Sequence, residues 1–235
     1  MKLDEFWNLI DNVNSTTKPD DQRAILAATK MALMEYSADD IVDWYHIKAQ
    51  YHVLSDRDDL WEECINLGIH ASDDGYYYFR AWLIAQGKDV FFSVLDNPNT
   101  LSNYVRSADD STFELYNYIA SDAYSERKIK DLYSETELEK MCEQWCVENE
   151  DRVERYSYHS NIDMGTGGKK LFQSYIRGKY NLYDRAEERP LSDDLKRQIR
   201  ESLVMKGPSL SNIIQGAKTS NLEKQNARII SEPER

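Results

Sequence analysis

Apolar residues recur along this chain at the three- and four-residue spacing of helices that bury one face. The first stripe of this kind is formed by Leu3, Phe6, Trp7, Ile10 and Val13. Similar stripes follow, and the last clear one is formed by Leu191, Leu195, Ile199 and Leu203. The pattern predicts an all-α fold, a bundle of about eight to ten helices.

Helix starts are marked by residues that can cap them. Ser37, Ser72 and Ser134 each precede an apolar stripe, where a serine hydroxyl accepts a hydrogen bond from a free backbone N–H group. Glu137 follows Ser134 at the spacing of a capping box. The 9 glycines and 5 prolines in 235 residues are few for the many turns of an antiparallel β fold.

The helical pattern weakens after residue 150. Residues 155–159 alternate between aromatic and other side chains, which predicts a strand or a loop. Residues 164–168 contain three glycines and are expected to form a flexible connection. A basic helix is then expected over residues 169–180.

Charge divides the chain at the same place. Residues 1–150 hold 13 Lys and Arg against 30 Asp and Glu, a formal charge of −17, whereas residues 151–235 hold 16 against 12, or +4. We therefore expect an acidic helical domain over residues 1–150 and a basic helical extension over residues 151–217. Residues 218–235 are polar and are expected to form a flexible tail.

The acidic balance bears on the class of partner. Such a surface repels the phosphate backbone of nucleic acid and attracts a basic protein, although acidity also serves solubility alone. Three cysteines cannot all pair with one another, and no apolar run is long enough to span a bilayer. We expect a cytoplasmic protein with reduced thiols, a protein partner and no membrane contact.

Two stretches of the acidic part carry a family resemblance. Residues 6–11 read Phe-Trp-Asn-Leu-Ile-Asp, and residues 72–87 read Ser-Asp-Asp-Gly-Tyr-Tyr-Tyr-Phe-Arg-Ala-Trp-Leu-Ile-Ala-Gln-Gly. Both stretches, and the spacing between them, resemble the bacterial domain-of-unknown-function 4240 family over about residues 1–130. The resemblance implies a compact helical bacterial domain. It carries over no catalytic residue, because the family has no known activity.

The second of these stretches supplies the candidate binding residues, which are Asp73, Asp74, Arg80 and Trp82. The two aspartates, with Glu62 and Glu63, offer the oxygen ligands that a hard divalent cation requires. They equally suit the first turn of a helix, where carboxylates complement free N–H groups and the helix dipole. We favour this structural interpretation, and we expect Arg80 to pair with a carboxylate and fix its helix.

Other motifs do not carry chemistry. Cys142 and Cys146 share a helix face, but His159 is the only further zinc ligand near them in the sequence. Residues 165–170 resemble a phosphate-binding loop, yet the spacing fails because Asp163 and Lys170 stand where a glycine and a hydroxyl residue belong. The sequence therefore predicts no metal, no cofactor and no catalytic residue.

The extension carries a small basic and aromatic segment, with cations at Lys169, Lys170, Arg177, Lys179 and Arg185. Such a segment can contact nucleic acid by neutralising phosphates and stacking on bases. Its charge equally complements the acidic domain of the same chain. We expect it to dock on that domain or on a partner protein.

The leading functional hypothesis is a protein-binding module, such as an inhibitor, immunity-like factor or regulator. It would engage a basic protein through an acidic, aromatic-rich surface. The second hypothesis is a metal-dependent enzyme or ligand-binding protein with a site around Asp73 and Asp74. The third is a weak nucleic-acid contact through residues 169–185. The partner and the oligomeric state stay open.

Overall fold

The computed structural model describes residues 1–69 and 72–204, and within these residues the regular structure is entirely helical. The α-helices are α1 Leu3–Thr16, α2 Gln22–Met34, α3 Ala38–Leu54, α4 Asp58–Asn66, α5 Asp73–Ala85, α6 Lys88–Asp96, α7 Ile119–Leu132, α8 Glu135–Glu148, α9 Glu150–Ser160, α10 Met164–Gly178, α11 Leu182–Glu188 and α12 Asp193–Val204. Three 3-10 helices lie between α6 and α7: η1 Pro98–Asn103, η2 Asp109–Ser111 and η3 Glu114–Asn117. The all-α prediction is confirmed, although the described helices outnumber the eight to ten expected. The predicted tail over residues 218–235 lies outside the described residues.

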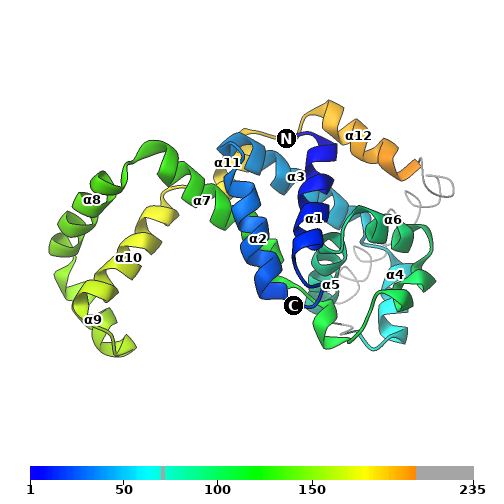
Figure 1. Ribbon diagram of the computed structural model, residues 1–235, viewed down its shortest axis with the longest axis horizontal. Coiled ribbons are helices and arrows are strands. Elements are labelled where there is room, and N and C mark those ends of the chain that lie inside the picture. The colour runs from blue at the N-terminus through cyan, green and yellow to red at the C-terminus, as the bar shows by residue number, and fades with distance from the viewer. Residues whose placement is uncertain (70–71, 205–235) are drawn as a thin grey trace, which may run out of the picture.

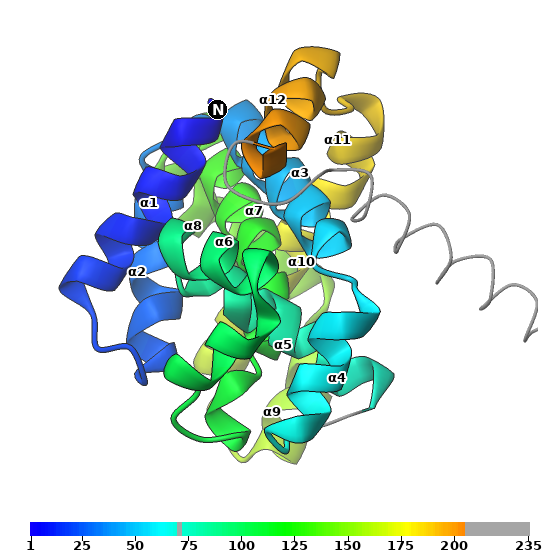
Figure 2. The same cartoon turned by 90° about the vertical axis from the view of Figure 1, so that its right-hand side faces the viewer.

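The body of the protein is built around one large apolar core, to which α1 to α7, α11 and α12 all contribute (Figure 1, Figure 2). Phe6 and Trp7 of α1 lie in this core, with ring centroids 5.8 and 4.8 Å from that of Tyr51 in α3. Phe91 of α6 packs on the same group, 5.4 Å from Trp7. The aromatic residues that open the family resemblance are therefore core residues.

The predicted helix starts are confirmed. Ser37, Ser72 and Ser134 each accept a hydrogen bond from the backbone N–H three residues further on. Glu137 completes the capping box by accepting the N–H of Ser134 at 2.8 Å. These interactions satisfy N–H groups that the first turn of a helix otherwise leaves free.

Helices α8, α9 and α10 form an arm that projects from the body, and α7 joins the two (Figure 1). The arm packs around a second, smaller apolar cluster whose buried members are Ile129, Trp145, Val153, Phe172 and Ile176. The boundary expected after residue 150 falls in the first turn of α9, inside this arm. The division of the chain into domains stays a prediction.

Two expectations for the arm were wrong. The strand or loop expected over residues 155–159 is part of α9, and the flexible connection expected over residues 164–168 is the first turn of α10. The Asp163 side chain caps α10 by accepting the Thr166 N–H at 2.9 Å. Gly167 and Gly168 are buried in that turn, so their role is close packing between helices.

The glycine at position 167 sets how closely α9 and α10 approach. A Cβ added at Gly167 would lie 2.0 Å from Ser157 Oγ and 3.2 Å from Ser157 Cβ. We expect Gly167→Ala to destabilise the arm by roughly 1–3 kcal/mol, because α10 must shift or Ser157 must turn away. Hydrogen exchange of the backbone amides would measure the loss. The amides of α9 and α10 should exchange faster in Gly167→Ala than in the wild type.

Gly178, at the end of α10, provides the matched control. An added Cβ there meets no atom within 4 Å. Gly178→Ala should therefore leave the arm unchanged or stabilise it by about 0.5 kcal/mol, since alanine favours helix more than glycine does. Equal effects of the two substitutions on amide exchange would refute the close-packing account.

Helices α11 and α12 return to the body and pack on α3 (Figure 2). The hydroxyl of Ser202 in α12 lies 3.1 Å from the Tyr51 hydroxyl. The Tyr51 hydroxyl also accepts the indole N–H of Trp7 at 3.2 Å. The Tyr51 hydroxyl of α3 thus links α1 to α12, which are far apart in the sequence. Helix α3 also carries side chains of the candidate site.

Candidate functional site

Asp73 and Asp74 occupy the first turn of α5, and both are exposed. The hydroxyl of Ser72 caps this helix by accepting the Gly75 N–H at 3.0 Å. Within residues 1–69 and 72–204, no three His, Cys, Asp or Glu side chains gather closely enough to hold a metal ion. The two aspartates are thus placed at a helix start, and a cation site around them stays a hypothesis.

Arg80 is buried between α3 and α5. Its guanidinium pairs with Asp56 at 3.3 Å and donates a hydrogen bond to the carbonyl of His52 at 3.1 Å. The same group lies over the rings of Tyr76 and Tyr77, 5.0 and 5.7 Å from their centroids. The expected carboxylate pair of Arg80 is confirmed, and it ties α5 to the end of α3.

Trp82 lies on another side of α5, because two residues advance a helix by roughly 200°. Its side chain is 6% exposed and stacks on Phe79 with centroids 5.7 Å apart. It also lines a hollow of about 260 Å³ with Asn14 of α1 and Ile25 of α2. Arg80 and Trp82 therefore face different neighbours, and the motif residues do not converge on one site.

A group of tyrosines from four parts of the fold does converge at the surface. Its members are Tyr45 of α3, Tyr77 and Tyr78 of α5, Tyr118 before α7, and Tyr183 of α11. Tyr77, Tyr118 and Tyr183 are 43%, 46% and 41% exposed. The rings of Tyr45 and Tyr183 meet edge to face with centroids 5.7 Å apart, so α11 is part of the group.

Carboxylates surround these phenols. Burial and then the neighbouring Tyr45, Tyr118 and Tyr77 raise the pKa of Tyr183, and Asp122 of α7 adds to the rise. Burial also raises the pKa of Tyr78, followed by Glu114 of η3 and Asp74. We call the five tyrosines, with Asp74, Glu114 and Asp122, the tyrosine surface. It combines aromatic area with negative charge.

Two basic side chains of α3 lie beneath this surface. Lys48 and His52 are only 6% and 7% exposed. The Lys48 ammonium donates a hydrogen bond of 2.7 Å to Asn117 Oδ1, and the His52 ring lies 4.4 Å from the ring of Tyr77. Burial lowers the pKa of Lys48 to about 7, and burial with repulsion from Arg80 lowers that of His52 to about 3.

The low pKa values of Lys48 and His52 affect the net charge of the tyrosine surface. His52 is neutral near pH 7, and Lys48 loses its proton in that range. The carboxylates of Asp74, Glu114 and Asp122 above them are exposed to water. The tyrosine surface therefore stays negative despite the basic residues below it.

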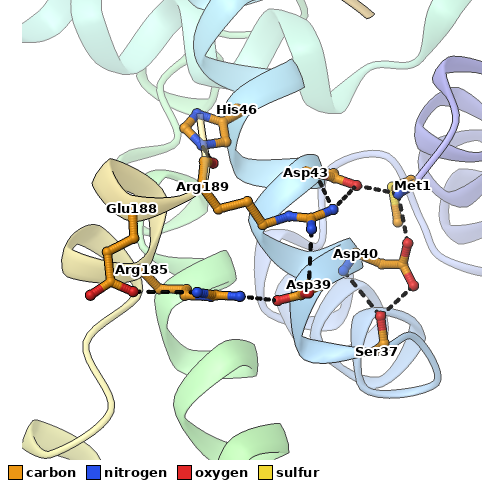
Figure 3. Close-up of polar contacts among 9 residues, drawn as sticks. All are labelled: Met1, Ser37, Asp39, Asp40, Asp43, His46, Arg185, Glu188 and Arg189. Atoms are coloured by element: carbon orange, nitrogen blue, oxygen red, sulfur yellow. Dashed lines mark hydrogen bonds and ion pairs between the residues drawn. The ribbon is translucent and has the colours of Figure 1, made fainter. Parts of the chain in front are cut away.

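Ion pairs hold α11, and with it Tyr183, against α3 (Figure 3). Arg185 reaches Asp39 at 3.1 Å, and Arg189 reaches Asp39 at 3.3 Å and Asp43 at 3.2 Å. The carbonyl of Arg189 accepts a hydrogen bond from His46 Nε2 at 2.9 Å. These contacts are half-buried, which strengthens them relative to fully exposed pairs.

The first residue of the chain extends the same network (Figure 3). The amino group of Met1 lies 2.5 Å from Asp43 Oδ2 and 2.6 Å from Asp40 Oδ1. Asp40 also accepts the hydroxyl of Ser37 at 2.5 Å. Burial alone would raise the pKa of Asp40, but these hydrogen bonds and the charge of the amino group hold it below its ordinary value.

The basic segment predicted from the sequence is spread over the arm and α11. Lys169 and Lys170 are exposed on α10, and Lys179 lies over the ring of Tyr175, 4.6 Å from its centroid. Arg177 pairs with Glu126 of α7 at 3.5 Å. Arg177 and Arg185 therefore contact the acidic part of the same chain, whereas no ion pair in the described residues joins the three lysines to it.

Sequence reasoning missed most of the tyrosine surface. Asp74 was a candidate, and Tyr183 lies within the basic and aromatic segment 169–185. Tyr45 and Tyr118 were not singled out, because no spacing relates residues from such distant segments. One usable signal was present in α5. Tyr76 shares the buried face with Phe79, and the helical period places Tyr77 and Tyr78 away from that face.

The fold and this surface define an all-helical protein with an acidic, tyrosine-lined face. The chain belongs to the family described as "Protein of unknown function (DUF4240)", whose model matches residues 1–126. No curated protein and no solved structure matches the chain. The resemblance noted from residues 6–11 and 72–87 is confirmed. The matched region contains the whole tyrosine surface except Tyr183.

Among residues 1–69 and 72–204, no helix combines the length and the apolar character needed to cross a membrane.

Proposed function

We propose that this protein is a binding module of the bacterial cytoplasm that engages a basic partner protein through the tyrosine surface. It would act as an inhibitor, immunity-like factor or regulator of that partner. The observation that carries the proposal is the convergence of five tyrosines and three carboxylates from separate parts of the fold. Tyrosine is among the residues that most often dominate binding energy at protein interfaces.

The chemistry of the surface suits lysine and arginine side chains. Asp74, Glu114 and Asp122 are exposed and can pair with cations of a partner. The phenol rings offer apolar area for the aliphatic stems of those side chains, and ring faces for their charged ends. Tyrosine also loses little conformational entropy on binding, because only two torsions are fixed.

The charge of the whole acidic part supports the same class of partner. Residues 1–150 carry −17, and the buried Lys48 and His52 offset little of the charge at the surface. A field of this sign accelerates encounter with a basic protein and slows encounter with nucleic acid. The rate of association should therefore fall as salt is added.

Alanine substitution at Tyr118 tests the proposal. The tagged full chain would capture its partner from native cytoplasm, and mass spectrometry would identify a basic protein in near-equal amount. In Tyr118→Ala, affinity for that protein should fall by about 10- to 30-fold, the effect of losing an interface tyrosine.

Tyr158 of α9 is the matched control, because it is 83% exposed and lies on the arm. Tyr158→Ala should capture as much partner as the wild type. Equal capture by the wild type and by Tyr118→Ala would refute the tyrosine surface as the binding site. Capture of an acidic protein or of nucleic acid alone would refute the class of partner.

A further inference from the structure

A groove runs along the arm between α8 and α10, where the two helices lie side by side (Figure 1). Its volume is about 1090 Å³. Apolar side chains line its floor, and they include Ile129, Leu138, Phe172 and Ile176. Charged and polar side chains of the three helices α7, α8 and α10 make up much of the remaining lining.

The arm is a single layer of helices with a small core. Only five apolar residues of its cluster are buried, while Leu138, Met141, Cys142 and Leu171 are packed against them but remain partly exposed. Helices with an apolar face usually bury it against a second layer. Among residues 1–69 and 72–204, no second layer of helices covers the arm, which projects away from the body.

Opposite charges line the two sides of the groove. On α8 the acidic row consists of Glu135, Glu139 and Glu143, and on α10 the polar row consists of Lys169, Gln173 and Arg177. Both rows have the four-residue spacing of one helix face. Because the two helices run in opposite directions, Glu143 and Lys169 lie toward the tip and Glu135 and Arg177 toward the body.

The two rows do not pair with each other within one chain. Arg177 pairs with Glu126 of α7, and no ion pair in the described part of the chain joins Lys169 to Glu139 or Glu143. The three glutamates of the acidic row are exposed, as are Lys169 and Gln173 of the other row, so these side chains are available to a second molecule. An occupant of the groove must bring an apolar face flanked by one acidic and one basic row.

We propose that this occupant is the arm of a second copy of the same chain. Two arms would pack groove to groove, so that α8 of each copy lies against α10 of the other. Each acidic row then meets a basic row, and the two apolar floors form the core of a four-helix bundle. The contact is self-complementary, as a two-fold symmetric interface requires. It does not depend on the tyrosine surface or its partner.

Light scattering after size-exclusion chromatography of the full chain gives the first test. The wild type should be a dimer whose fraction rises with concentration. Reversing the α8 row with Glu139→Lys and Glu143→Lys should give a monomer, because α8 of one copy would repel Lys169 of the other. Reversing the α10 row with Lys169→Glu and Gln173→Glu should do the same. All four side chains are exposed, so both variants should keep the helix content of the wild type.

Mixing the two variants gives the decisive result. In the mixed pair, the basic α8 of the first variant meets the acidic α10 of the second. The acidic α8 of the second variant meets Lys169 on α10 of the first, so a heterodimer should form. A monomeric wild type at every concentration would overturn the proposal. A mixture that stays monomeric while both variants remain folded would overturn it as well.

Discussion

Replacing Lys48 by methionine should raise the free energy of unfolding by roughly 3 kcal/mol below pH 7. Lys48 is 6% exposed, and within the described residues its ammonium group donates a hydrogen bond to Asn117 and lies 5.9 Å from the centroid of the Tyr116 ring, with no carboxylate paired to it. A buried ammonium without a carboxylate is costly, and methionine fills a similar volume without a charge. Equilibrium unfolding in urea at several pH values would measure the gain.

The pH dependence follows from the pKa of Lys48. Its ordinary value is 10.5, and burial lowers it to about 7 in the folded protein. Between these values the unfolded chain binds a proton that the folded protein does not, so wild-type stability rises with pH through this window. The advantage of Lys48→Met should therefore be largest below pH 7 and shrink toward zero near pH 10.5.

Lys88 is the control for this comparison. It is a surface residue, with its ammonium group 3.7 Å from the Asp4 carboxylate. Lys88→Met should change stability by less than about 0.5 kcal/mol, with no growth toward low pH. A Lys48→Met variant that is less stable than the wild type at pH 6, or equally improved at every pH, would contradict a buried, destabilising ammonium group.

Trp7→Ala should lower the free energy of unfolding by about 3–5 kcal/mol. Trp7 is 1% exposed, and its ring lies 5.4 and 5.6 Å from those of Phe91 and Phe92. Alanine would leave a cavity among α1, α3 and α6, and would remove the hydrogen bond to the Tyr51 hydroxyl. Thermal and urea unfolding followed by far-ultraviolet circular dichroism would show the loss.

Trp7→Phe separates the two contributions. Phenylalanine keeps an aromatic ring in the core but leaves the Tyr51 hydroxyl without its indole donor. It should lower stability by less than half as much as alanine does, about 1–2 kcal/mol. If Trp7→Ala cost less than about 1 kcal/mol, the family motif around this residue would need a role other than core packing.

The sequence predicted local features of the fold well. The caps at Ser37, Ser72 and Ser134 were predictable because a capping hydroxyl and its N–H partner are three residues apart. The apolar stripe of α1 was predictable for the same reason. Such features depend on neighbours along the chain and on little else.

Close packing in the arm was not predictable in this way. Gly167 and Gly168 are glycines because Ser157 of α9 and Cys146 of α8 lie against them. Read locally, glycines at a helix start and a serine on a helix face indicate a loop. Only the approach of the three helices explains their presence.

The candidate site shows the same limit more strongly. Asp74 could be singled out from its motif, but Tyr45, Tyr118 and Tyr183 become neighbours only when α11 docks on α3. That docking depends on Arg185 and Arg189, which meet Asp39 and Asp43 from about 146 residues away. The opposite net charges of residues 1–150 and 151–235 indicated that the two parts of the chain attract each other. They did not indicate which residues would be in contact.

The dissociation constant of the captured partner, measured with the tyrosine surface neutralised, tests the central claim most directly. The variant would combine Asp74→Asn, Glu114→Gln and Asp122→Asn. The control would combine Glu148→Gln, Asp151→Asn and Glu154→Gln, which remove the same charge from the arm. We predict that the first variant binds at least about tenfold more weakly with a shallower salt dependence, whereas the control binds like the wild type. Equal affinity of all three proteins would contradict a basic partner held by this surface.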